Sequence, residues 1–378
     1  MGETMGEIGK LGFGFMRLPL IERDGEQIID IEQAKQMVDI FMEAGFTYFD
    51  TARGYHLGKS EGALKEALVD RYPRESFQIA SKLPAWASKG ADHSRAMFDK
   101  SLRETGAGYF DFFLMHNMGE GRTKAFDEQG IWDFLFEKKD AGLIRNLGLS
   151  FHDKADVFAE VLDSHPPVDF VQLQINYADW ENSLVESRKC YEVARERNLP
   201  VIVMEPVKGG SLVRLPAAAT DVLRAANPDV SIASWGLRFA ASLPGVLTVL
   251  SGMSTPDQVR DNVKTMTELG PLTEDERAAL EQVRAILAAI PTVPCTSCQY
   301  CVEGCPEGIN IPVVLNALNV VTLFDDKAMA SNEYDWRTAD ARASSCIECG
   351  ACENACPQHI AIIDELKRAV ELFEKNPA

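Results

Sequence analysis

Two cysteine runs of identical spacing near the C-terminus constrain this chain more than any other feature. They contain eight of its nine cysteines: Cys295, Cys298, Cys301 and Cys305, then Cys346, Cys349, Cys352 and Cys356. Each run reads C-x2-C-x2-C-x3-C-P, the spacing by which thiolates hold cubane 4Fe–4S clusters. Zinc also accepts four thiolates, but zinc sites rarely use three such closely spaced cysteines with a fourth before a proline. The sequence therefore predicts two 4Fe–4S clusters.

The duplicated run resembles that of two-cluster ferredoxins. That resemblance implies crossed ligand sets, in which the last cysteine of each run reaches the other run's cluster. Cys295, Cys298, Cys301 and Cys356 would hold one cluster, and Cys346, Cys349, Cys352 and Cys305 would hold the other. The spacer of 40 residues between the runs is longer than in compact ferredoxins. It favours a mostly helical dicluster module of the kind that is fused to larger enzymes.

Length and charge limit the remaining possibilities. With 378 residues, 46% of them hydrophobic, the chain is long enough for two folded domains, expected at 1–290 and 291–378. The net charge of −19 argues against a nucleic-acid or anionic-membrane partner, because phosphate binding needs a basic surface. The acidic surface is either a solubility device or a docking surface for a basic redox partner.

The expected location is the cytoplasm. No apolar run reaches the roughly 18 residues that a membrane span needs, and the N-terminus lacks the basic-then-apolar pattern of a secretory signal. Thiolates that hold clusters also argue against a disulfide-forming compartment.

Short apolar segments alternate with amphipathic ones between residue 11 and about residue 251. The expected strands are Leu11–Phe15, Thr47–Asp50, Phe77–Lys82, Phe110–His116, Ile144–Ser150, Phe170–Ile175, Pro200–Glu205 and Val246–Ser251. Helical patterns such as Ile31–Glu43 lie between them, and repeated strand–helix units imply parallel strands covered by helices. Eight units predict a closed α/β barrel of the (β/α)8 or TIM type. An open doubly wound sheet is the alternative, although no GxGxxG opens the first helix.

Polar residues stand at or just beyond the ends of three consecutive expected strands. Asp50, Lys82 and His116 each end a strand, and Tyr55 follows Asp50 by five residues. The C-terminal strand ends form the active-site face of such barrels, so these side chains should converge. Taken singly, each has a structural explanation, such as an ion pair or a core histidine. Together they predict an active site.

These four residues, in this order and placement, resemble the Asp, Tyr, Lys and His tetrad of the aldo-keto reductase family, over roughly residues 10–265. The resemblance implies reduction of an aldehyde or ketone, with Tyr55 as the proton donor. A Lys82 cation would lower the pKa of the tyrosine, and Asp50 would hold the lysine in place. His116 would donate a hydrogen bond to the substrate oxygen.

The same resemblance implies NADP(H) or NAD(H) as cofactor. The matching positions are Arg17, Ser150, Gln172, Pro206, Gly210, Ser211, Gly252 and Asn262. NADPH-preferring members carry a Lys and an Arg where this chain has Gly252 and Gln258, so the choice between NADH and NADPH stays open. Phe151 stands where the family usually has Asn.

The two halves of the chain imply different electron chemistry. A nicotinamide transfers two electrons as hydride, whereas a cluster accepts one at a time, and no flavin fingerprint is present to mediate between them. The clusters could be structural, could pass electrons from a partner such as a ferredoxin, or could regulate the enzyme. The leading prediction is a carbonyl reductase acting on a small molecule. The alternatives are a ferredoxin-linked electron-transfer protein and a redox-responsive binding protein.

Overall fold

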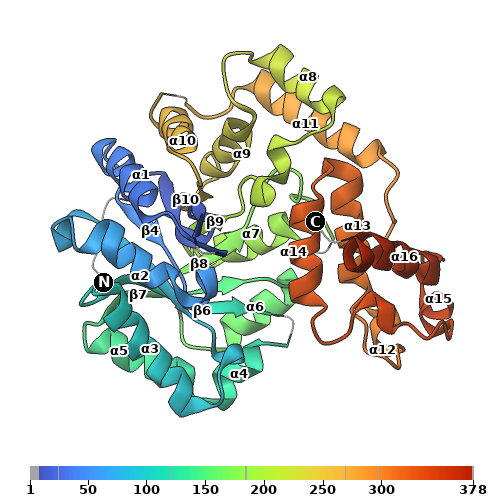
Figure 1. Cartoon of the computed structure of the whole chain (residues 1–378), viewed down its shortest axis with the longest axis horizontal. Helices are drawn as coiled ribbons and strands as arrows, with labels where there is room; N and C mark the ends of the chain where they lie inside the picture. The colour runs from blue at the N-terminus through green and yellow to red at the C-terminus, as the bar shows by residue number, and fades with distance from the viewer. Residues whose placement is uncertain are drawn as a thin grey trace. The chain divides into compact units, whose positions relative to one another are not determined.

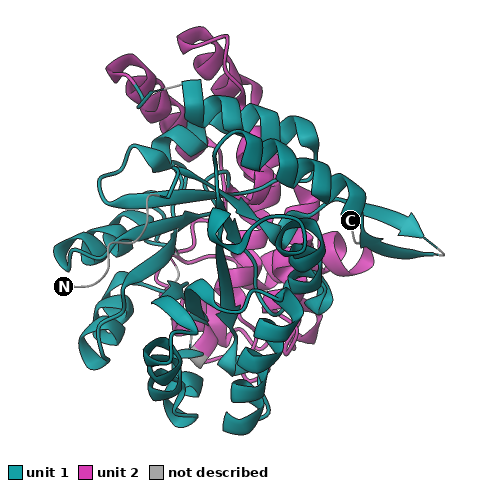
Figure 2. Ribbon diagram, turned by 90° about the vertical axis from the view of Figure 1, so that its left-hand side faces the viewer, with its two compact units in different colours: residues 1–207, 233–272 teal, residues 208–232, 273–378 magenta. Residues whose placement is uncertain are grey.

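The computed structural model describes residues 8–376, apart from residues 24, 120, 184, 269 and 297. The chain divides into two compact units (Figure 2). Unit 1 comprises Met1–Val207 and Ala233–Leu272, and unit 2 comprises Lys208–Ile232 and Thr273–Ala378. Unit 2 therefore takes in Lys208–Ile232 and the helix after Thr273 as well as the cysteine runs. The expected domain boundary at residue 290 stays a prediction.

Eight parallel strands close into a barrel in unit 1 (Figure 1), which confirms the (β/α)8 prediction. The strands are β1 (Leu11–Gly14), β4 (Tyr48–Asp50), β5 (Gln78–Leu83), β6 (Phe110–Met118), β7 (Ile144–Phe151), β8 (Phe170–Gln174), β9 (Val201–Met204) and β10 (Val246–Gly252). Each pairs with its neighbour in sequence order, and β1 pairs with β10 to close the ring. All eight expected strands are present, with ends shifted by at most two residues.

Helices alternate with these strands along the chain, as Figure 1 shows. They are α1 (Ile31–Glu43), α2 (Ser60–Leu64), α3 (Ala91–Thr105), α4 (Thr123–Glu128), α5 (Ile131–Asp140), α6 (Ala155–Ser164), α7 (Ser187–Glu196), α9 (Ile232–Ala241) and α10 (Pro256–Glu268). Helix α1 shows why they form. Asp30 caps its start by accepting a hydrogen bond from the Gln33 amide at 3.1 Å, and Gly45, with φ of 84°, follows its end.

The alternation of side chains along each strand builds two separate cores. Tyr48, Ala80, Phe112, Leu114, Phe170, Ile202 and Leu250 form a cluster inside the barrel. The residues between them, such as Phe49 and Phe113, belong to the larger core between strands and helices. Burying each such side chain stabilises the fold by about 1.5–3 kcal/mol. The interior is tight: a Cβ at Gly148 would lie 2.6 Å from the Phe170 ring.

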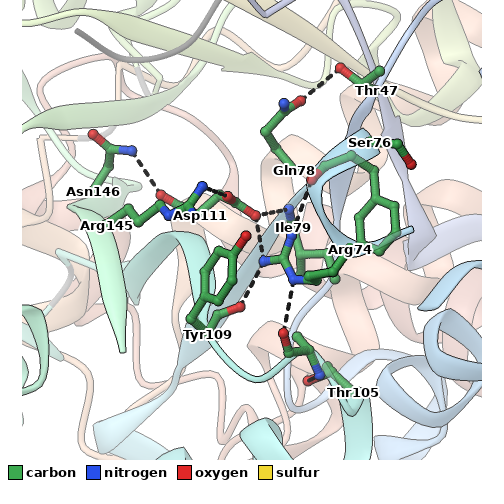
Figure 3. Close-up of polar contacts among 12 residues, drawn as sticks. Thr47, Arg74, Ser76, Gln78, Ile79, Thr105, Tyr109, Asp111, Arg145 and Asn146 are labelled. Atoms are coloured by element: carbon green, nitrogen blue, oxygen red, sulfur yellow. Dashed lines mark hydrogen bonds and ion pairs between the residues drawn. The ribbon is translucent and has the colours of Figure 1, made fainter. Parts of the chain in front are cut away.

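A network of charges ties together the N-terminal ends of three strands (Figure 3). Asp111, the second residue of β6, accepts hydrogen bonds from Arg74 at 2.6 Å, Arg145 at 3.0 Å and the Ile79 amide at 3.0 Å. The two guanidinium carbons lie 3.8 and 4.0 Å from the centre of the Tyr109 ring. This network lies at the opposite end of β6 from His116.

A hairpin between β1 and α1 was not anticipated from the sequence. Strands β2 (Leu20–Arg23) and β3 (Glu26–Ile29) pair antiparallel, with Leu20 opposite Ile29. Gly25 in the turn has φ of 80°, a conformation that favours glycine. The side chains of β2 are all exposed. A strand that contributes to no core shows no apolar alternation, so the usual signal was absent.

Unit 2 is helical. Its helices are α8 (Ala217–Ala226), α11 (Glu274–Ala289), α12 (Tyr300–Glu303), α13 (Ile311–Phe324), α14 (Lys327–Arg337), α15 (Ala351–Ala355) and α16 (Ile362–Ala369). A capping box opens α11: the Glu276 amide donates to Thr273 Oγ1 at 3.2 Å, and the Thr273 amide donates to Glu276 Oε2 at 2.9 Å. Among the described residues, no helix combines the length and apolar character of a membrane span.

Candidate active site and cluster sites

The barrel brings the four tetrad residues together. Asp50 is the last residue of β4, and Lys82 and His116 lie near the ends of β5 and β6. Side chains two residues apart on a strand point to the same side. The three residues each follow an interior side chain by two positions and so point into the barrel; the interior residues are Tyr48, Ala80 and Leu114. Tyr55 begins the turn Tyr55–Gly58 after β4, and its ring centroid lies 5.8 Å from that of His116.

Lys82 is the centre of this group. Its ammonium donates to Asp50 Oδ1 at 2.5 Å, to the Thr51 carbonyl at 2.8 Å and to the Tyr55 hydroxyl at 3.4 Å. The lysine is only 1% exposed. Burial alone would lower the pKa of Lys82, but the Asp50 carboxylate and Tyr55 outweigh it and the pKa is raised. The lysine is therefore a fixed cation with its three donors directed at named acceptors.

The environment of Tyr55 differs from the expectation in one respect. Lys82 does pull the pKa of Tyr55 down, but the removal of the phenol from water has the larger effect, and the pKa lies above its ordinary value of 10. The charges of Asp50 and Glu205 act in the same direction as burial. The prediction of a lowered tyrosine pKa was therefore wrong in its net direction, because desolvation of a phenolate costs more than one neighbouring cation returns. Tyr55 is a neutral phenol at ordinary pH.

His116 is also neutral. Burial lowers the pKa of His116 well below its ordinary value of 6.5, and the nearby cations Lys82 and Arg122 act in the same direction. Its Nδ1 is buried without a hydrogen-bond partner among the described residues. The backbone at this point is held by Trp86, whose indole N–H donates to the His116 carbonyl at 2.9 Å. A neutral imidazole can donate one hydrogen bond without bringing a positive charge.

A buried carboxylate that sequence reasoning missed supports the loop that carries Tyr55. Glu61 is fully buried, accepts a hydrogen bond from Ser81 at 2.8 Å and pairs with Arg53. Arg53 also pairs with Glu104. Ser60 beside it donates to the Phe15 carbonyl at 3.1 Å. These bonds hold Arg53, Ser60 and Glu61 on either side of Tyr55. In the sequence, the charges of Arg53 and Glu61 were the only indication of such a network.

Two expected cofactor residues lie on neighbouring strands of the same barrel. Gln172 points into the barrel two residues beyond Phe170, and its Oε1 is buried without a hydrogen-bond partner within the described part of the chain. An unpaired buried acceptor fits an amide N–H of a ligand, such as a carboxamide. The hydroxyl of Ser150 accepts from the Asn117 amide at 2.7 Å, so its own proton is available for another acceptor.

A second group of expected residues gathers where β1 and β10 end side by side. Gly14 pairs with Gly252, and the Arg17 side chain packs so closely there that a Cβ on Gly252 would lie 3.1 Å from it. Asn262 donates to Ser251 Oγ at 2.8 Å. On α10, Arg260 is exposed and pairs with Asp257.

The remaining expected residues fall in different units. Pro206 belongs to unit 1, whereas Gly210 and Ser211 belong to unit 2. Both Gly210 and Ser211 lie in the short helical turn Lys208–Val213. Ser211 is fully buried, and its hydroxyl donates to Asp326 at 3.1 Å. That contact could not be anticipated, because Asp326 is 115 residues away in the chain.

The eight run cysteines line two separate cavities in unit 2. The thiols at one cavity are those of Cys295, Cys298, Cys301 and Cys356. The thiols at the other are those of Cys305, Cys346, Cys349 and Cys352. Within the described ranges, no three His, Cys, Asp or Glu side chains are arranged to hold a single metal ion. Thiols that surround a cavity rather than converge on one point fit a cubane better than a mononuclear zinc ion.

Comparison with protein families gives two matches that together span most of the chain. The model of the Aldo/keto reductase family matches residues 10–285. The model of the 4Fe-4S dicluster domain matches residues 294–361.

Individual proteins agree with the first match. An aldo-keto reductase of Mycolicibacterium vanbaalenii is 27% identical over 70% of this chain and 88% of its own length. L-galactose dehydrogenase of Arabidopsis thaliana is 25% identical over 77% of this chain and 94% of its own. Among solved structures, an aldo-keto reductase from Klebsiella pneumoniae in complex with NADPH superimposes with a TM-score of 0.57 at 21% identity, covering 73% of this chain and 91% of its own.

Proposed function

The chain belongs to the aldo-keto reductase family and carries a 4Fe–4S dicluster domain, and from this premise we propose that it reduces an aldehyde or ketone with NAD(P)H. The proposed catalytic residues are Asp50, Tyr55, Lys82 and His116. The observation that carries the proposal is the buried Lys82 ammonium, which bonds Asp50 on one side and lies 3.4 Å from the Tyr55 hydroxyl on the other.

The charge state of each residue suggests its role in the proposed reaction. A nicotinamide dinucleotide held in the barrel would supply the hydride for the carbonyl carbon. Tyr55, held protonated by its burial, gives its phenolic proton to the carbonyl oxygen, and the product is the alcohol. The Lys82 cation offsets the negative charge left on the phenolate, and Asp50 keeps that cation in place. His116, being neutral, donates a hydrogen bond that orients the substrate oxygen.

The cofactor residues of this proposal are those that the family resemblance assigns. Gln172 Oε1, an unpaired buried acceptor, would receive the carboxamide N–H group. Arg17 and Asn262, near the paired ends of β1 and β10, would serve the phosphate and adenosine end, and so would Gly210 and Ser211 in the turn after β9. Gly252 and Gln258 offer no cation to a 2′-phosphate, and the proposal covers both NADH and NADPH.

The cysteines around the two cavities are the proposed cluster ligands, in crossed sets. Each set has four thiols, the number that a 4Fe–4S cluster requires, and each contains the last cysteine of the other run.

Substitution of Tyr55 by Phe tests the proposed chemistry. It removes the proton donor and little else, so we expect NAD(P)H-dependent reduction of a panel of aldehydes and ketones to fall by about 10²–10⁴-fold. Cofactor binding and the cluster absorption band should be unchanged. Tyr191→Phe is the matched control, since that hydroxyl bonds the Pro244 carbonyl instead. Undiminished turnover in Tyr55→Phe would refute the assignment.

One observation favours a second candidate function, exchange of electrons with a redox partner. Cys349 is exposed, and Ile347 beside it is 60% exposed. A cluster held by Cys349 would therefore have one ligand at the surface, where a partner can approach. Adding NADH to anaerobic, cluster-loaded protein without a carbonyl distinguishes the roles. Bleaching of the cluster band would mean that the nicotinamide and the clusters exchange electrons, and an unchanged band would leave hydride transfer as a separate process.

A further inference from the structure

A single buried carboxylate from the segment between the two cysteine runs holds the turn that follows β9. Asp326 is only 5% exposed. Its Oδ2 accepts the hydroxyl proton of Ser211 at 3.1 Å, and its Oδ1 accepts from the Arg214 guanidinium at 3.1 Å. Both partners flank or lie within the turn Lys208–Val213, more than a hundred residues earlier in the chain. The contact is entirely within unit 2.

The turn needs such support because its backbone is unusual. Lys208, Gly209 and Gly210 have φ values of 49°, 63° and 106°, three consecutive residues in the left-handed region. Lysine adopts this region at a cost, and the two glycines have no side chain that could restrain the backbone. Within the turn, the Arg214 amide donates to the Ser211 carbonyl at 3.0 Å. Asp326, by contrast, is firmly placed, because its Oδ1 also caps α14 by accepting from the Met329 amide at 3.1 Å.

We propose that Asp326 is a positioning residue for the dinucleotide. It holds the turn Lys208–Val213 in the form that receives the pyrophosphate, so cofactor affinity depends on the segment between the two cysteine runs. This inference rests on the proposed function, which places Gly210 and Ser211 at the cofactor. The Ser211 proton is directed at Asp326, so the hydrogen bonds that the turn offers a phosphate come from its backbone N–H groups, whose direction the turn's conformation fixes.

The same residue connects the turn to the cluster cavities through one helix. Ile311 lines one cavity, Pro312 and Leu315 line the other, and all three belong to the first turns of α13. Asp326 lies two residues after Phe324, where this helix ends. With 14 residues, α13 spans about 20 Å. Loss of the clusters would free the start of α13, and the position of Asp326 depends on that helix.

Replacing Asp326 by Asn tests the proposal on cluster-loaded, anaerobic protein. We expect the Kd for NADH and for NADPH, measured by fluorescence titration, to rise about tenfold, since a charged hydrogen-bond acceptor is lost at two partners. The matched control is Asp325→Asn, which removes the same charge from an exposed neighbour and should change the Kd by less than about twofold. Without any cofactor, the amides of residues 208–214 should exchange hydrogen faster in Asp326→Asn than in Asp325→Asn.

Two results would overturn the proposal. An unchanged Kd in loaded Asp326→Asn would mean that the turn needs no such support, and a lower Kd would mean that the carboxylate competes with the pyrophosphate. If Asp326→Asn does not retain its clusters, Arg214→Gln decides by the same measurements, with Arg224→Gln on α8 as its control. Wild-type protein that binds neither dinucleotide would defeat the proposed function itself, whereas normal wild-type binding with an unaffected variant would defeat this inference alone.

Discussion

Lys82 and His116 show how burial assigns protonation states in this site. Lys82 is buried and His116 is partly buried, yet the lysine is kept charged by Asp50 while the histidine, which has no such carboxylate, is kept neutral. Tyr55 follows the histidine's pattern, since burial outweighs its single cation. The result is a neutral phenol, a fixed cation and a neutral imidazole at one place, with no titration among them near neutral pH.

The neutral state of His116 has a consequence for stability. Its pKa is well below 6.5 in the fold, so below about pH 6.5 the unfolded chain binds a proton that the folded chain does not, and stability falls with falling pH. Above that pH the histidine has no effect. We expect His116→Asn to reduce the loss of unfolding free energy between about pH 6.5 and pH 5.5 by up to about 1.4 kcal/mol. Urea titrations at both pH values measure it.

The control for this prediction is His93→Asn, because His93 is exposed on the surface of α3. It should leave the acid dependence as in the wild type. An acid dependence that is the same in His116→Asn as in the wild type would show that the histidine is protonated in the fold.

At the level of elements, the barrel separates the charged network around Asp111 from the charged groups of the proposed active site. Asp111 lies near the start of β6 and His116 near its end. The first joins the beginnings of β5, β6 and β7 through Arg74, Arg145 and the Ile79 amide (Figure 3). A substitution at the start of the strand should therefore change stability without changing the reaction at its other end.

Substitution of Asp111 by Asn tests this separation. Two guanidinium groups lose a buried partner, so we expect the free energy of unfolding to fall by about 3 kcal/mol. Carbonyl reduction at a temperature where the variant is folded should change little. Asp92→Asn, at a fully exposed position of α3, is the control and should leave both quantities as they are. A large loss of turnover in folded Asp111→Asn would contradict the separation.

The helices and strands that could be predicted from the sequence are those with a face buried in the hydrophobic core. Strands such as Phe110–Met118 and helices such as α1 carry apolar residues at the period of their structure, because one face or both are buried. Strand β2 of the hairpin β2–β3 is exposed along its whole length, and the hairpin was missed. The tetrad was predicted because consecutive strand ends must meet. The hold of Asp326 on Ser211 was not, because nothing local to either residue indicates a partner 115 positions away.

At the scale of the whole molecule, the chain combines an aldo-keto reductase barrel with a 4Fe–4S dicluster domain. The cluster cavities draw their thiols from both cysteine runs, and the segment between the runs also supplies Asp326. Unit 2 therefore contains both the cysteine runs and the turn Lys208–Val213, which comes from the part of the chain that follows β9.

The crossed ligand sets can be tested by comparing single and double substitutions. Cys356 and Cys301 line the same cavity, so Cys356→Ala and Cys301→Ala should each disrupt the same one of two clusters, and the double variant should lose little more iron than either single one. Uncrossed sets would instead make Cys356→Ala equivalent to Cys352→Ala. Iron content and the spectra of the reduced protein measure the outcome. Cys190→Ala, which removes a buried thiol outside both runs, should retain all the iron.

Each cluster cavity takes its fourth cysteine from the other run, and this determines when each set of four cysteines becomes complete during synthesis. A chain made from its N-terminus exposes Cys295, Cys298 and Cys301 early, but the fourth thiol at their cavity, Cys356, is the last of all the cysteines to appear. The turn Lys208–Val213 is also synthesised long before Asp326, which accepts the hydrogen bond of Ser211. The barrel strands are all complete by Gly252, so every barrel strand and the four proposed catalytic residues are synthesised before the chain has all the cysteines of either cluster.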